Sequence, residues 1–148
     1  MRARLAVSAL AAFLIVFSAT AMEAVSAESV LSGTRWMEVT QAEAEGTITV
    51  ERLYRVRLCT IADVAFVIRE GLLMRFDRSV LSGKTQPAGY ARSETSPAND
   101  GATLIELYIA LDSAAPDRVR IDTSGDVMRI EGGNASPTAY FMKCRPQN

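Results

Sequence analysis

The stretch GTITVERLYRVRLCTI, residues 46–61, has the longest clear two-residue period in the chain. Apolar side chains occupy alternate positions over most of its length, with threonine, glutamate and arginine between them. Strand side chains point alternately to the two faces of a sheet, so this pattern predicts a long, half-buried β-strand. Arg52 interrupts the apolar face, and we expect a bulge near Arg52 and Leu53, or an edge position, to accommodate it.

The N-terminal residues 1–27 have the composition of a secretion signal. Arg2 and Arg4 precede an apolar run over residues 5–17, and Val25-Ser26-Ala27 fits a small-x-small cleavage site. A second site of this kind is Ala19-Thr20-Ala21. The alternative is an uncleaved membrane anchor, since residues 5–22 carry no charge and reach the lower limit for a membrane span. We expect cleavage, no stable membrane span afterwards, and a secreted or periplasmic protein.

Charge and cysteine content limit the classes of function that are expected for the remaining single domain, residues 28–148. Removing Arg2, Arg4 and Glu23 from 16 basic and 17 acidic residues leaves a net charge of −2. That balance gives no general attraction to nucleic acid or anionic membranes. In an oxidising compartment, Cys59 and Cys144 are the only pair that can form an intramolecular disulfide, and we predict this bond.

The hexapeptide at residues 31–36, Leu-Ser-Gly-Thr-Arg-Trp, has the pattern L-x-G-T-x-W. It resembles the opening of META-type domains, which are small, β-rich, secreted or periplasmic bacterial modules. Lipocalin-like barrels open similarly with G-x-W, where the spacing is one residue shorter. The resemblance implies a small β-domain and implies no function. In the residues themselves, Gly33 allows a turn and Trp36 is a large core anchor at the start of a first strand over residues 36–39.

The same reasoning predicts further strands. Residues 62–70 admit a helix or a strand, and their β-branched residues and phenylalanine favour the strand. Residues 72–76 continue as a strand. The apolar alternation over residues 103–111, within a segment that extends to residue 114, predicts another strand, with helix as the competing interpretation. Short strands between turns are expected over three final segments, residues 118–121, 127–131 and 138–144.

Residues 82–101 are rich in glycine, proline and serine, which predicts a loose loop with at most a short strand at residues 89–93. The expected fold is mostly β: a single small antiparallel β-barrel or β-sandwich, with room for one short helix, closed by one disulfide. The predicted core consists of Trp36, Ile48, Val50, Val56, Leu58, Ile105, Leu107, Ile109, Ile130 and Phe141.

The chain contains no histidine, which excludes Ser-His-Asp and Cys-His catalysis and histidine metal ligands. We expect no cofactor, no metal site and no catalytic residues. A carboxylate pair in a cleft is the remaining enzymatic arrangement. The residues that could supply it are Asp63, Asp77, Glu106 and Asp112.

Arginines form the one patterned polar feature. Arg55 and Arg57 share one predicted strand face, Arg118 and Arg120 share another, and Arg129 lies on the next strand. If these strands are neighbours, their outer face could grip carboxylate or phosphate. The simpler interpretation is a solvated face with Glu51, Asp122 and Glu131 as partners of the arginines.

These observations favour an exported, non-enzymatic binding module whose ligand is an apolar small molecule or a protein partner. The alternative is a structural or envelope-associated protein without a small ligand. An internal apolar cavity would favour the small ligand. A filled core with an exposed apolar patch would favour the protein partner.

Overall fold

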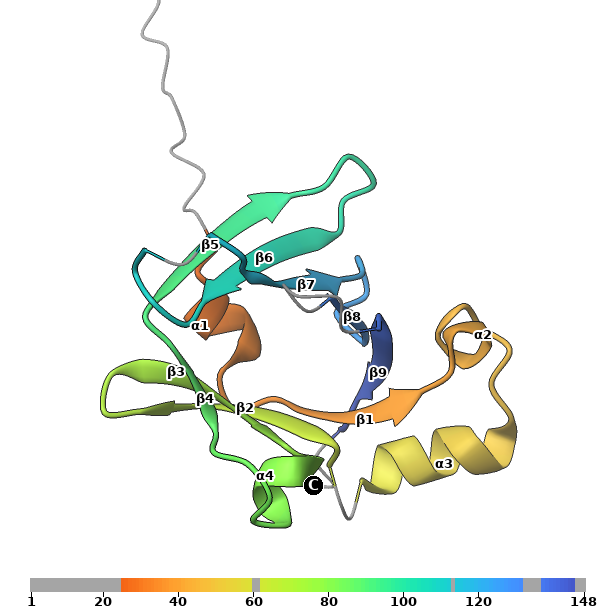
Figure 1. Ribbon diagram of the computed structural model, residues 1–148. Helices are drawn as coiled ribbons and strands as arrows, with labels where there is room; N and C mark the ends of the chain where they lie inside the picture. The colour runs from red at the N-terminus through yellow and green to blue at the C-terminus, as the bar shows by residue number, and fades with distance from the viewer. Residues whose placement is uncertain (1–24, 60–61, 113, 132–136, 146–148) are drawn as a thin grey trace, which may run out of the picture.

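A computed structural model of the chain describes residues 25–59, 62–112, 114–131 and 137–145. Within these residues, nine antiparallel strands form one sheet that curls into a nearly closed barrel (Figure 1). The strands are β1 (Arg35–Val39), β2 (Val64–Arg69), β3 (Leu72–Asp77), β4 (Ala88–Tyr90), β5 (Arg92–Pro97), β6 (Thr103–Tyr108), β7 (Asp117–Ile121), β8 (Val127–Glu131) and β9 (Ala139–Lys143). Their order in the sheet is β4-β3-β2-β1-β9-β8-β7-β6-β5. The mostly β, antiparallel fold expected from the sequence is therefore confirmed, and of the two expected architectures, barrel or sandwich, it is the barrel.

The barrel closes where the chain passes from one end of the sheet to the other. β4 pairs with β3 and β5 pairs with β6, and the two end strands are separated in sequence only by Ala91. The Ala91 amide already donates to the carbonyl of Tyr108 over 2.8 Å. One bent segment thus supplies both ends of the sheet, and its backbone hydrogen bonds change partner at Ala91.

Four short helices accompany the sheet in the described part of the chain: α1 (Ala27–Leu31), α2 (Gln41–Ala44), α3 (Val50–Leu58) and α4 (Arg78–Leu81). None of the described helices is long and apolar enough to cross a bilayer. Residues 1–24 of the expected leader lie outside the described residues. Its expected boundary after residue 27 falls inside α1, because Ser26 caps this helix and Ala27 is buried.

The prediction of a strand over residues 46–61 is wrong for the described residues 46–59, because Val50–Leu58 forms helix α3; residues 60 and 61 lie outside the described residues. The Thr49 hydroxyl caps its first turn by accepting from the Arg52 amide, and Glu51 pairs with Arg55 one turn later. Val56, with Leu53 one turn before it and Cys59 one turn after it, faces the protein at helical spacing. Val50 points away from the protein with 85% of its surface exposed.

The interior of the barrel is filled by side chains. Trp36, Phe66, Leu31, Ile105 and Leu107 are the largest of the fully buried residues, and they belong to one continuous cluster. Of the predicted core, the residues that are buried are Trp36, Val56, Ile105, Leu107, Ile130 and Phe141. Of the other predicted core residues, Ile48 and Leu58 are half-buried, and Val50 and Ile109 are exposed.

The other segment predictions have mixed outcomes. Residues 62–70 contain strand β2, as favoured, and residues 103–114 contain β6, which ends at Tyr108 and leaves Ile109 exposed beyond it. The segment 82–101 is not a loose loop throughout, since it contains β4 and β5. The polar run over residues 92–96 belongs to β5, where every side chain is exposed or half-buried.

The predicted disulfide between Cys59 and Cys144 is present, with 5.5 Å between the Cα atoms. The elements that it joins differ from the prediction. Cys59 follows the last turn of α3, and Cys144 follows β9, where its amide donates to the Arg35 carbonyl over 2.8 Å. The bond fastens α3 to the outside of the barrel, where both cysteines form a small buried cluster with Ala62.

Candidate binding site at the mouth of the barrel

Several inward positions of the barrel are polar. Glu38 lies opposite Phe141, Arg75 opposite Phe66 and Asp77 opposite Val64 in the strand registers, so each shares the inner face with a buried apolar partner. Asp117 likewise lies opposite buried Leu107. These side chains line a cleft of about 340 Å³, whose other lining residues are Asp63, Val64, Arg78, Ser79, Ile130, Pro137, Ala139 and Phe141.

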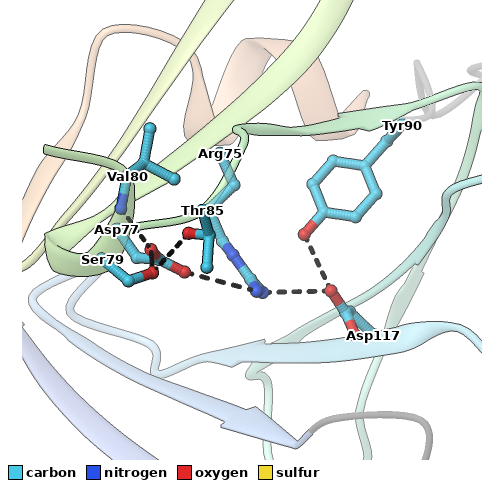
Figure 2. Close-up of polar contacts among 7 residues, drawn as sticks. All are labelled: Arg75, Asp77, Ser79, Val80, Thr85, Tyr90 and Asp117. Carbon is cyan, nitrogen blue, oxygen red and sulfur yellow. Dashed lines mark hydrogen bonds and ion pairs between the residues drawn. The ribbon is translucent and has the colours of Figure 1, made fainter. Parts of the chain in front are cut away.

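Arg75, Asp117 and Tyr90 form a connected group at this cleft. Figure 2 shows the Arg75 guanidinium between two carboxylates, with the Tyr90 hydroxyl pointing at the Asp117 carboxylate. Arg75 Nη1 lies 3.0 Å from Asp117 Oδ2, and the Tyr90 hydroxyl donates to the same oxygen over 2.8 Å. Burial is the main cause that raises the pKa of Tyr90, so its phenol stays protonated and acts as a donor.

Asp77 links this group to the short helix α4. Its Oδ1 atom caps the helix by accepting from the Ser79 hydroxyl over 2.5 Å and from the Val80 amide over 3.3 Å. Its Oδ2 atom lies 3.9 Å from Arg75 Nη2 (Figure 2). The Ser79 hydroxyl also lies 2.6 Å from that of Thr85. Asp77 therefore has a structural role at both oxygens and holds Arg75 from the side opposite Asp117.

Asp63 and Glu38 occupy another part of the cleft. Asp63 is a buried acidic residue whose Oδ2 atom accepts from the Glu38 amide over 2.7 Å, while its Oδ1 atom pairs with exposed Arg78. The side chain of Glu38 forms no ion pair with any described residue, and Glu38 is exposed. Glu38 thus presents a carboxylate without an ion-pair partner among the described residues, in a cleft whose three other carboxylates, from Asp63, Asp77 and Asp117, are already engaged.

The charges of the cleft do not cancel. Four carboxylates, from Glu38, Asp63, Asp77 and Asp117, face two guanidinium groups, from Arg75 and Arg78, so the formal charge is −2. Apart from Ser79, apolar side chains supply the rest of the wall. Such a cleft can accept a cationic group on an apolar stem. Among the described residues, no three side chains of the metal-ligating types come together as a metal site.

The carboxylates singled out in the sequence separate into two sets. Asp63 and Asp77 line the cleft together, whereas Glu106 lies on the outer face of β6 and Asp112 is exposed in the turn after it. Sequence reasoning missed Glu38, Arg75, Arg78, Tyr90 and Asp117. A signal was present for Arg75, because it interrupts the predicted apolar strand over residues 72–76 on the side that Leu73 buries.

The arginine face is only partly as predicted. Arg118 and Arg120 on β7 share the outer face with Arg129 on β8, where they line a hollow of about 270 Å³. Arg55 and Arg57 lie instead on helix α3. Arg118, Arg120 and Arg129 pair with Glu106, Asp100 and Glu131, respectively. Hydrogen bonds from Arg118 and then Tyr108 lower the pKa of Glu106. This agrees with the interpretation as a solvated face. Of the partners named beforehand, Glu131 pairs with Arg129, and Glu51 pairs with Arg55 on α3.

The L-x-G-T-x-W segment has a structural explanation. Leu31 and Trp36 are fully buried, and Gly33 has a positive φ of 75° that favours glycine. The Thr34 hydroxyl donates to the Leu31 carbonyl over 2.6 Å and accepts from Trp36 Nε1 over 2.8 Å. Each of the four specified residues of the pattern thus helps to join α1 to β1. Comparison of the chain with family models, with curated proteins and with solved structures finds no match.

Proposed function

We propose that the protein is an exported, non-enzymatic binding module that recognises a cationic group at the mouth of its barrel. The observation that carries this proposal is the excess of carboxylates in a half-apolar cleft, with Glu38 unpaired among the described residues. The ligand class is an ammonium or guanidinium group on an apolar stem. Both a small amine and a lysine or arginine side chain of a partner protein have this chemistry.

The expected affinity follows from the interactions that the cleft offers to one cationic side chain. A hydrogen bond to a charged group contributes about 1.5–3 kcal/mol. Burial of four methylene groups adds about 3 kcal/mol, at about 0.8 kcal/mol for each. Part of this sum is lost to the cost of association. Because that cost is about 4 kcal/mol or more, the net affinity of a single side chain is weak, with a Kd above about 1 mM.

A protein partner is favoured over a free small ligand. Buried side chains fill the described part of the barrel interior, and a single cationic side chain binds weakly. Val67, Ile68 and Leu72 near the turn between β2 and β3 are exposed apolar residues, which are typical of a surface that contacts another macromolecule. The same exposed residues favour a second candidate, a structural or envelope-associated protein that uses this surface and not the cleft.

Calorimetric titration tests the proposal with two matched probes. Nα-acetyl-lysine methylamide carries the ammonium group, and its norleucine analogue carries a similar stem without charge. We expect binding of the lysine probe only, weakened about tenfold by Glu38→Gln, which corresponds to about 1.4 kcal/mol. Glu70→Gln makes the same chemical change at the exposed turn between β2 and β3 and should have no effect.

A second titration distinguishes the two sources of the cationic group. A lysine-rich peptide that binds much more tightly than the single residue would indicate a protein partner. Equal affinities would indicate a small amine. Equal binding of the lysine and norleucine probes, or no binding of either probe or of the peptide, would refute recognition of a cation and favour the structural candidate.

A further inference from the structure

The start of the folded domain lies upstream of Glu28. Ser26 caps helix α1, since its hydroxyl accepts from the Ser29 amide over 3.1 Å and its carbonyl accepts from the Val30 amide over 3.2 Å. The Ser29 hydroxyl donates to the same carbonyl over 2.8 Å. Ala27 follows with 1% of its surface exposed. Both Ser26 and Ala27 therefore belong to the fold.

Helix α1 contributes to the closure of the barrel. It contacts β2 and β5, and Ala27 and Leu31 are members of the main core cluster (Figure 1). The Ser93 hydroxyl of β5 donates to Glu28 Oε1 over 3.4 Å. The helix thus lies beside the part of the sheet where β4 and β5, the two end strands, pair with other neighbours and not with each other.

A cut after Ala27 conflicts with this arrangement. It would remove the cap and a buried core residue, and it would place a new ammonium group at the positive end of α1. Once the domain has folded, the bond after Ala27 is also inaccessible to a peptidase, because Ala27 is buried.

We propose that the leader is removed between Ala21 and Met22, at the small-x-small sequence Ala19-Thr20-Ala21. A signal peptidase would consume one water, break the bond between the Ala21 carbonyl carbon and the Met22 nitrogen, and leave a carboxylate on Ala21 and an ammonium on Met22. This cut retains the cap of α1, with residues 22–25 before it. The proposal rests on the export that the proposed function assumes and is independent of the cationic ligand.

Mass spectrometry and N-terminal sequencing of the exported full-length gene product test the site. We expect a chain that begins at Met22. A chain that begins at Ala27 or Glu28, or a full-length chain in the membrane fraction, would overturn the proposal. The calorimetric titrations address the ligand separately, so the processing site and the cleft can fail independently.

Two variants make the test specific. Ala21→Tyr replaces the small residue before the proposed cut and should block processing. Val25→Tyr alters the small-x-small sequence of the alternative cut at a residue with 57% of its surface exposed, so it should leave both the fold and the processing unchanged. The reverse pattern would overturn the proposal. The chain that begins at Glu28 should also unfold at a lower urea concentration than the chain that begins at Met22. Equal urea midpoints would contradict the structural role of Ser26 and Ala27.

Discussion

Arg75→Met should destabilise the protein by leaving the carboxylate of Asp117 with one partner in place of two. Asp117 accepts from Arg75 Nη1 over 3.0 Å and from the Tyr90 hydroxyl over 2.8 Å. The Arg75 and Asp117 side chains are 21% and 18% exposed. Their pairing is therefore screened much less by solvent than that of a surface pair, and Tyr90 cannot compensate for the lost charge.

The magnitude follows from the burial of the pair. Loss of one partner from a fully buried ion pair costs about 3–5 kcal/mol. Because about one fifth of each side chain remains in water, we expect Arg75→Met to lower the free energy of unfolding by about 2–4 kcal/mol. Asp117→Asn in the same background removes the unpaired charge but retains an oxygen for Tyr90, so the double variant should lose less than the two single variants together.

A double-mutant cycle by urea denaturation measures this coupling. We expect about 1–3 kcal/mol between Arg75 and Asp117, because directly contacting residues in a network couple in this range. The exposed pair Glu51 and Arg55 on α3 is the matched control, with a 2.6 Å contact and side chains 76% and 65% exposed. Its coupling should be about 0.3–0.5 kcal/mol.

Salt concentration separates the two pairs further. Raising the ionic strength from about 0.1 M to about 1 M shortens the Debye length from about 10 Å to about 3 Å. The coupling of the exposed pair should fall, and that of Arg75 with Asp117 should change little. A coupling below about 0.5 kcal/mol at the cleft would mean that the group behaves like a surface ion pair, and the reasoning from its burial would be refuted.

Two other predictions concern stability. Replacing Cys59 and Cys144 by serine should lower the free energy of unfolding by up to about 4–5 kcal/mol, because the bond closes a segment with a sequence separation of 85; an unchanged urea midpoint would contradict this. Burial, above all, raises the pKa of Tyr90, so its protonated phenol stabilises the fold fully below about pH 10 and less as the pH rises beyond that value. Above pH 10, the wild type should therefore lose about 1.4 kcal/mol per pH unit more than Tyr90→Phe in urea denaturation, and parallel pH profiles would argue against the burial of this phenol.

Local patterns in the sequence predicted most strands but failed at α3. The strands β2, β3 and β6 to β9 follow from β-branched residues, alternation and clear turn sequences. In residues 46–61 the same alternation is coincidental. The interruption at Arg52, which we attributed to a bulge, indicates a helix instead: Thr49 caps the first turn, and Glu51 and Arg55 are spaced as a helical ion pair.

The cleft could be predicted only in fragments, because its residues come from distant strands. Tyr90 and Asp117 are 27 residues apart, and Arg75 and Asp117 are 42 apart, so no local pattern connects them. These residues come together because the sheet curls into a nearly closed barrel, whose end strands, β4 and β5, follow each other in sequence. Both strands lie in residues 82–101, whose composition indicated a loop. The disulfide was predictable without the fold, because the chain contains only two cysteines.

The most direct test of cation binding at the barrel mouth is a residue-resolved NMR titration of ¹⁵N-labelled protein with a lysine-rich peptide. The account predicts that the amide signals of Glu38, Asp63 and Ser79 shift together and saturate with one common Kd, since these residues line one cleft. Glu38→Gln should weaken all three shifts. Shifts confined to the outer face around Arg120 and Arg129, or no saturating shift at the cleft, would contradict it.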